Sequence, residues 1–203
     1  MAERAGGDQP TPTTSTVEGE WEPGPLAGRR FEAVLFRDVV LEGIDERGAA
    51  FADCTFRDCT FSASVHADAA FTNCTFVACH FFDVRFERSK LVGSLFDGCT
   101  FEALAVEGGD WSLAGLPGAD LRRATFHGVR LREADLTGAR LDGGAFRDCD
   151  LSGAWLHRAS LRATDLRGSD LSAIDPRNAD ITGALVDVEG AMTIALALGV
   201  RIG

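Results

Sequence analysis

The sequence predicts an all-β fold in which the chain winds as a coil, with one short helix at its C-terminal end. Large apolar residues recur at every fifth position from Leu26 to Val186, and small neutral residues recur in a second register two positions earlier. A period of five matches neither the 3.6 residues of a helical turn nor the two-residue alternation of a strand. We therefore expect five residues to form one side of a coil and the core to be a stack of coils.

The register of large residues is the stronger of the two signals. Of its 33 positions, 13 are Phe and 13 are Leu. Random placement would put only about five or six Phe and Leu residues there, so the period identifies an internal repeat. Thirteen of the 14 Phe residues lie in this register, and Phe82 is the exception. The rule is broken at Glu46, His66 and Pro176.

The register of small residues accounts for all six cysteines. From Val34 to Ala184 every member is neutral and most are small. Its cysteines are Cys54, Cys59, Cys74, Cys79, Cys99 and Cys149. A zinc site would favour pairs spaced Cys-x-x-Cys, whereas these cysteines follow the repeat. We expect free thiols that fill space in the core, and no metal site.

Several five-residue runs share an Asp-Leu pair after a small residue, at residues 119–123, 134–138, 149–153 and 169–173. These runs resemble the A(D/N)LXX unit of the pentapeptide-repeat proteins, and the likeness covers about residues 21 to 203. The segments 64–76, 109–121 and 182–191 further resemble the MfpA/Qnr group, which is associated with fluoroquinolone resistance. The register runs without interruption from Phe31 to Val186, whereas many Qnr proteins carry inserted loops, so the resemblance is closest to MfpA.

This resemblance implies a right-handed quadrilateral β-helix with four pentapeptides per coil, which dimerises through its C-terminus into a rod. It implies a protein that binds DNA gyrase by imitating duplex DNA, and that inhibits the enzyme or protects it from fluoroquinolones or other gyrase poisons. It implies neither a cofactor nor an enzyme activity. The alternative is a structural or adaptor solenoid that binds an unrelated protein.

The charge distribution favours a basic or neutral partner. The chain carries 31 acids and 20 Lys and Arg, a net charge of −11, which disfavours direct binding of nucleic acid or of anionic membranes. Residues 32 to 120 hold 15 acids and six bases. At a coil rise of ~4.8 Å, this is about one net charge per 2.4 Å, against about 1.7 Å in duplex DNA. Residues 121 to 186 hold nine acids and ten bases, so their mean field is near zero.

Stacking at 20 residues per coil separates structural charges from candidate binding charges. The columns Lys90, Asp110, Arg130, Asp150 and Arg122, Asp142, Arg162 alternate in sign and are expected to be stabilising ladders. Asp38 over Asp58 and Glu87 over Glu107 are instead stacks of like charge. The candidate partner-binding acids are Asp38, Asp58, Asp83, Glu87, Asp97 and Glu107.

The three breaks in the register have structural interpretations. Glu46 and His66 are 20 residues apart, so one lies above the other. A local kink and a partly buried ion pair both remain open there, and we expect the kink. Pro176 removes a backbone donor, which a coil near the end of the rod tolerates. No nucleophile motif, phosphate-binding loop or interior cleft is indicated, so we expect no catalytic site.

The two ends of the chain differ from the repeat. Residues 1–20 are rich in Gly, Pro and Thr and are expected to form a disordered arm. The solenoid is expected over residues 21–186, with Trp21 and Leu26 covering the first coil, and residues 187–203 are expected to form the helix and dimerisation segment. Asp187 can cap a helix from about Val188 to Leu198 that ends at Gly199.

The helix is apolar on almost every side, which favours burial in a dimer over a monomeric cap, although both remain open. The expected interface residues are Val188, Met192, Ile194, Leu196, Leu198 and Val200. The sequence shows no secretory signal and no apolar stretch near the ~20 residues of a membrane span, so we expect a cytoplasmic protein.

Overall fold

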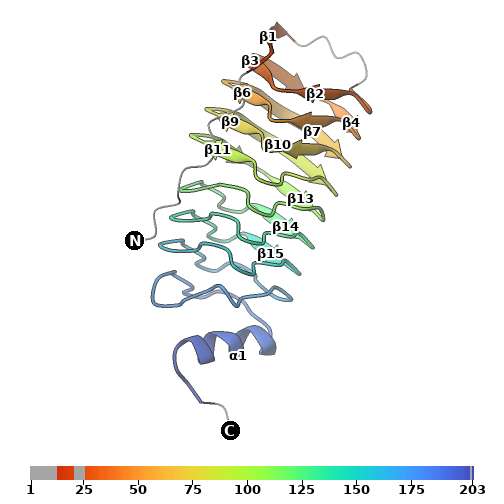
Figure 1. Cartoon of the computed structure of the whole chain (residues 1–203). Helices are drawn as coiled ribbons and strands as arrows, with labels where there is room; N and C mark the ends of the chain where they lie inside the picture. Colours follow the sequence, from red (N-terminus) through yellow and green to blue (C-terminus); the bar gives the residue numbers. More distant parts are fainter. Residues whose placement is uncertain (1–12, 21–25, 202) are drawn as a thin grey trace.

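The computed structural model describes residues 13–20, 26–201 and 203. The described chain is a parallel β-solenoid whose coils are stacked along one axis, with helix α1 at the C-terminal end (Figure 1). From β2 onward, successive coils are paired in parallel at a spacing of 20 residues, as in Phe36 with Phe56 and Asp45 with Val65. Since the repeat is five residues long, each coil has four sides, as expected.

The described elements follow one another in chain order. They are β1 Ser15–Glu20, β2 Arg30–Glu32, β3 Val34–Glu42, β4 Asp45–Arg47, β5 Ala50–Ala52, β6 Thr55–Arg57, β7 Thr60–Ala67, β8 Ala70–Thr72, β9 Thr75–Val77, β10 His80–Glu87, β11 Leu95–Asp97, β12 Thr100–Glu102, β13 Ala105–Glu107, β14 Thr125–His127, β15 Ala145–Arg147 and α1 Val188–Ala197. We number the sides by these strands. The first side holds β2, β5 and β8; the second holds the start of β3 with β6, β9 and β11; the third holds the end of β3, the starts of β7 and β10, and β12; and the fourth holds β4, the ends of β7 and β10, and β13 to β15.

The corners between sides depend on one backbone conformation. The residue two positions after each large residue adopts a positive φ in nearly every repeat, for example 53° at Asp38 and 70° at Gly93. Glycine, asparagine and aspartate tolerate this left-handed region best. This requirement explains why the corner column is rich in Gly and Asp.

The core consists of aromatic rings stacked from coil to coil. Phe36, Phe56 and Phe76 are stacked with centroid distances of 4.7 and 4.8 Å and interplanar angles of 8° and 9°. The small-residue column lies beside them, and Cys59 Sγ donates to the carbonyl of Phe36 at 3.5 Å. All six cysteines are free, and burial raises the pKa of the Cys149 thiol to about 11. The cysteines are therefore core-filling thiols, as expected.

Glu46 and His66 form a buried pair, so our expectation of a kink was wrong. Both residues stay in register, and His66 Nδ1 lies 3.0 Å from Glu46 Oε2. The other carboxylate oxygen accepts from the N–H of Ala49 at 2.6 Å, and His66 Nε2 lies 3.2 Å from Ser64 Oγ. The backbone remains regular because every polar atom of the pair has a partner within the core.

The C-terminal coils use a tighter corner than the Phe-rich coils. There the N–H of a small residue donates to the carbonyl of the large residue three positions earlier, as in Ala134 to Leu131 at 3.1 Å. The Asp before the large residue accepts from the N–H two positions later, as Asp135 does from Thr137 at 3.0 Å. The Asp of the Asp-Leu pair therefore stabilises a turn.

The N-terminal end corrects one expectation. Residues 15–20, which we assigned to a disordered arm, form β1, which pairs in parallel with β3 from Ser15 opposite Val34. The exposed edge of the first complete coil offers backbone partners, and these outweigh the polar composition of the segment. Residues 1–12 and Trp21 lie outside the described residues, and Leu26 is buried as expected.

The C-terminal helix matches its expected position. α1 spans Val188–Ala197, and the Asp187 carboxylate accepts from the N–H of Gly190 at 2.8 Å. Gly199 has a φ of 88° just after the C-cap residue Leu198. Ile194 packs against the core, so this residue anchors the helix to the last coil and is not part of the exposed apolar face.

Candidate protein-binding surfaces

The structure does not bring the six expected partner-binding acids together on one side. Asp38 and Asp58 lie at the corner between the second and third sides, and Asp97 lies on the second side. Asp83 lies at the corner between the third and fourth sides, and Glu87 and Glu107 are paired neighbours on the fourth. The second and fourth sides face in opposite directions, so no single flat partner contacts all six.

The two expected stacks of like charge have different surroundings. Glu107 is not isolated, because its carboxylate lies 3.2 Å from His127 Nδ1, and the other ring nitrogen lies 3.1 Å from Asp148. Asp38 and Asp58 sit at left-handed corners with φ of 53° and 54°. Aspartate is tolerated at such corners, so the conformation alone favours these two residues.

Most acids of the C-terminal half are held by arginines or by turns. Asp120 accepts from Arg122 at 2.8 Å and also pairs with Arg140, and the Arg122 guanidinium is the main reason that the pKa of Asp120 lies below its usual range. Arg147 and Arg167 both bind Asp165. These carboxylates are therefore already neutralised in the folded chain.

The two expected charge ladders have different outcomes. In the first, Asp110 pairs with Arg130 at 3.2 Å and backbone β-bridges keep the column in register from Lys90 to Asp150, but Asp150 pairs with Arg132 instead of Arg130. In the second, Arg122 pairs with Asp120 within its own coil, because the short Asp side chain two positions earlier lies within reach of the guanidinium. Ser160 donates to Asp142. The column Arg122, Asp142, Arg162 is thus not the ion-pair ladder that we expected.

The acids without an ion pair are concentrated in the N-terminal half of the described chain. Among the residues that the structure describes between 26 and 110, they are Glu32, Asp38, Glu42, Asp53, Asp58, Asp83, Asp97 and Glu102. Glu42 and Glu102 were missed in the sequence because Ser62 and Phe82 lie between them in the column, so they form no like-charge stack. Their separation of 60 residues, three coils of 20, is the sequence signal that places both on the same side.

The C-terminal end carries a second exposed surface, which is apolar. Its exposed side chains are Leu185, Val188, Met192, Leu196, Leu198 and Val200. Val188 is 71% exposed and Leu196 57%, values that are unusual for large aliphatic side chains on the cap of a folded core. Leu185 was not predicted, because it belongs to the last coil and not to the helix.

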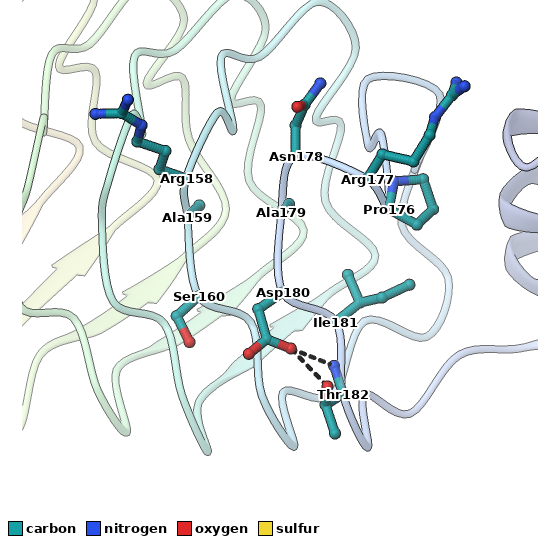
Figure 2. A pocket seen from close by; sticks show the side chains of 10 residues that line it. All are labelled: Arg158, Ala159, Ser160, Pro176, Arg177, Asn178, Ala179, Asp180, Ile181 and Thr182. Carbon is teal, nitrogen blue, oxygen red and sulfur yellow. Dashed lines mark hydrogen bonds between the residues drawn. The ribbon is translucent and has the colours of Figure 1, made fainter.

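One recess in the described chain is an open depression of about 560 Å³ near the C-terminal end (Figure 2). Its lining includes Asp180, whose carboxylate accepts from the N–H and hydroxyl of Thr182 at 3.0 and 2.6 Å. The guanidinium groups of Arg158 and Arg177 point in different directions, so they do not converge on a common ligand. Ser160, Asn178 and Asp180 in this lining already make hydrogen bonds within the fold.

The described residues carry neither a cluster suited to a metal ion nor a helix that could span a membrane. No cluster of three or more His, Cys, Asp or Glu side chains suits a metal ion within that part of the chain. None of the helices in the described ranges is long and apolar enough to cross a membrane.

The repeat defines the class of protein. The family model for pentapeptide repeats matches residues 116–143 and 145–183, and the model for the SV2A/B/C luminal domain matches residues 26–101. The first match places pentapeptide repeats within residues 116–183, and the five-residue register and the 20-residue bonding describe the fold as a parallel β-solenoid. No curated protein sequence matches the chain.

Three solved structures illustrate what the chain is similar to. Full-length QnrB1, described as a plasmid-mediated fluoroquinolone resistance protein, is 20% identical with a TM-score of 0.42, over 91% of this chain and 100% of that chain. A trypsin-treated QnrB1 variant is 21% identical with a TM-score of 0.48, over 94% and 99%. A pentapeptide-repeat protein from the Arabidopsis thaliana thylakoid lumen is 21% identical with a TM-score of 0.21, over 79% and 76%. These are likenesses of architecture alone.

Proposed function

We propose that this protein is a dimeric acidic rod that binds DNA gyrase in competition with DNA, and so inhibits the enzyme or protects it from fluoroquinolones or other gyrase poisons. The observation that carries the proposal is the set of unpaired acids in the N-terminal half of the rod. A DNA-binding enzyme presents Lys and Arg to the phosphate backbone, and a rigid row of carboxylates competes for the same surface.

The contrast between the two halves of the rod supports this proposal. Carboxylates such as Asp120 and Asp165 are neutralised by arginines, so they stabilise the fold and contribute little to an external field. Acids such as Asp58 and Asp97 have no such partner among the described residues and remain available. The sequence segments that resemble the MfpA/Qnr group point to the same class of partner.

The apolar C-terminal surface supports the dimer. Two copies of this surface related by a twofold axis would bury Met192, Leu196 and Leu198 and cover the last coil of each solenoid. The acidic halves would then lie at the two distal ends of the rod. Sedimentation velocity of the wild type and of the Leu196→Glu variant tests this arrangement, with a dimer expected for the first and a monomer for the second.

The test of function is a supercoiling assay with purified bacterial gyrase, titrated with this protein with and without a fluoroquinolone. We expect inhibition of supercoiling at micromolar protein or below, and we score drug-induced DNA cleavage in the same reactions to detect protection. Weaker inhibition at higher salt is expected, because screening reduces attraction between exposed charges.

The variant Glu32→Lys, Glu42→Lys, Asp97→Lys, Glu102→Lys reverses four of the unpaired charges in the N-terminal half. Its inhibition should be lost while its far-UV circular dichroism is retained. Absence of inhibition and of protection by a folded wild-type dimer would contradict the proposed function and favour an adaptor role.

A further inference from the structure

We infer that the third side of the N-terminal coils is the surface that docks on the partner, with Phe82 as its apolar anchor. This inference rests on the proposed function and identifies the side of the rod that makes contact. The partner that fits this side is a basic protein surface with an apolar recess between its Lys and Arg side chains.

The third side, which we call the Phe82 face, is a flat four-strand ladder. Its outward positions run in two columns, Val40, Thr60, His80, Thr100 and Glu42, Ser62, Phe82, Glu102, with the corner residues Asp38, Asp58 and Asp83 along its borders. Successive coils are paired without a register shift, so these side chains form a regular array.

Phe82 lies on the surface, whereas the other Phe residues lie in the core register. It is the one Phe outside the core register, and its side chain is 55% exposed, whereas its neighbour Phe81 is 1% exposed. Val40 on the same face is 44% exposed. Folding gains little from either of these outward side chains, whereas aromatic side chains are enriched at the centres of protein interfaces.

Charge complementarity defines the partner. The Phe82 face carries the five acids Asp38, Glu42, Asp58, Asp83 and Glu102, all exposed, and across the four described coils from Asp38 to Glu102 it carries no Lys, no Arg and no ion pair. Each of the other three sides in these coils carries at least one base, such as Lys90, Arg57 or Arg85. Five of the eight unpaired acids of the N-terminal half therefore lie on this one side or at its borders.

The spacing of these charges suits a DNA-binding surface. The five acids are spread over four coil levels, or about 19 Å at a strand spacing of ~4.8 Å. That is about one charge per 3.8 Å, against about 3.4 Å along one strand of duplex DNA. An exposed ring within the row distinguishes this face from DNA itself, because it adds an apolar contact that a phosphate backbone lacks.

The test uses two variants of the Phe82 face and two matched controls in the supercoiling assay. Phe82→Ala removes the anchor, and its control, Leu95→Ala, truncates a side chain that is 40% exposed on the second side. The triple variant Asp38→Asn, Asp58→Asn, Asp83→Asn removes three charges at corners where Asn is tolerated. Its control removes three unpaired charges elsewhere by Glu32→Gln, Asp53→Asn and Asp97→Asn.

We expect each variant of the Phe82 face to raise the protein concentration for half-inhibition about tenfold or more, and each control to change it less than threefold. Unchanged thermal unfolding of all four variants shows that the fold is intact. If wild type inhibits gyrase but the face variants match their controls, the choice of face is wrong and the proposed function survives. If folded wild type neither binds nor inhibits gyrase, the proposed function fails and this inference fails with it.

Discussion

The pair formed by Glu46 and His66 allows a quantitative test of how the core tolerates polar groups. Replacing His66 by Phe restores the residue type that the register prefers, and the new ring would stack on Phe86, which lies 5.2 Å from the His66 ring at 24°. It also leaves the Glu46 carboxyl, 1% exposed, without its imidazole partner. Leaving a buried hydrogen-bonding group without its partner costs about 1–3 kcal/mol.

We therefore expect His66→Phe to lower the free energy of unfolding by about 1–3 kcal/mol, although it increases aromatic burial. The double variant Glu46→Gln, His66→Phe should recover at least half of that loss. Its amide oxygen can still accept from the N–H of Ala49, and no carboxyl group is left buried without its imidazole partner. Urea unfolding at neutral pH, followed by far-UV circular dichroism, measures both values.

His157→Phe is the control, since His157 is exposed and its replacement should leave stability within about 0.5 kcal/mol of wild type. A His66→Phe variant as stable as the wild type would refute the reasoning. That result would mean that the carboxyl of Glu46 finds water or another partner once the imidazole is gone.

Three further predictions concern stability. Phe81→Ala should destabilise the fold by about 3–5 kcal/mol, because Phe81 is 1% exposed, whereas Phe82→Ala should change stability by less than about 0.5 kcal/mol; urea unfolding of the two variants compares them. Asp135→Ala should cost about 0.5–1.5 kcal/mol through loss of its bond to the N–H two residues later, and Asp135→Asn should cost less, in the same assay. The N–H groups of Gly190 and Gly168 hold the pKa of Asp187 below its usual range, so the ionised carboxylate stabilises the fold above about pH 3.9, and this stabilisation is lost as the pH falls through the lower folded value. Melting temperatures from pH 6 to pH 3 should therefore fall more steeply for wild type than for Asp187→Asn, and parallel curves would contradict this assignment.

The period of five made the solenoid predictable, because one register of Phe and Leu and one of small residues leave few other arrangements of the core. The position of α1 was also predictable, since Asp187 and Gly199 mark its ends with ordinary capping chemistry. Both features depend on local sequence and on a strict repeat, so no knowledge of distant contacts was needed.

The remaining features depend on contacts that composition does not record. β1 forms from Thr- and Gly-containing sequence only because the edge of β3 is free to pair with it. Glu46 and His66 could equally have marked a kink, since only the positions of Ala49 and Ser64 show that every polar atom is satisfied. Which acids remain unpaired depends on which of them form an ion pair with an arginine. Arg122 pairs with Asp120 two positions earlier and not, as we had expected, with Asp142 in the next coil.

Because the coils from β2 onward pair at a fixed distance of 20 residues, an insertion or deletion affects the core and the surface of this protein differently. Insertion or deletion of five residues would keep every large side chain in the core. It would move each later residue to the neighbouring side of the coil, so outer side chains before and after the change would no longer be aligned. Gain or loss of 20 residues would change only the length of the rod. The same hydrophobic core can thus accommodate many surface patterns. Insertion or deletion of whole repeats would change which side chains are aligned on each side of the rod, and so which partner it binds, without disrupting the fold.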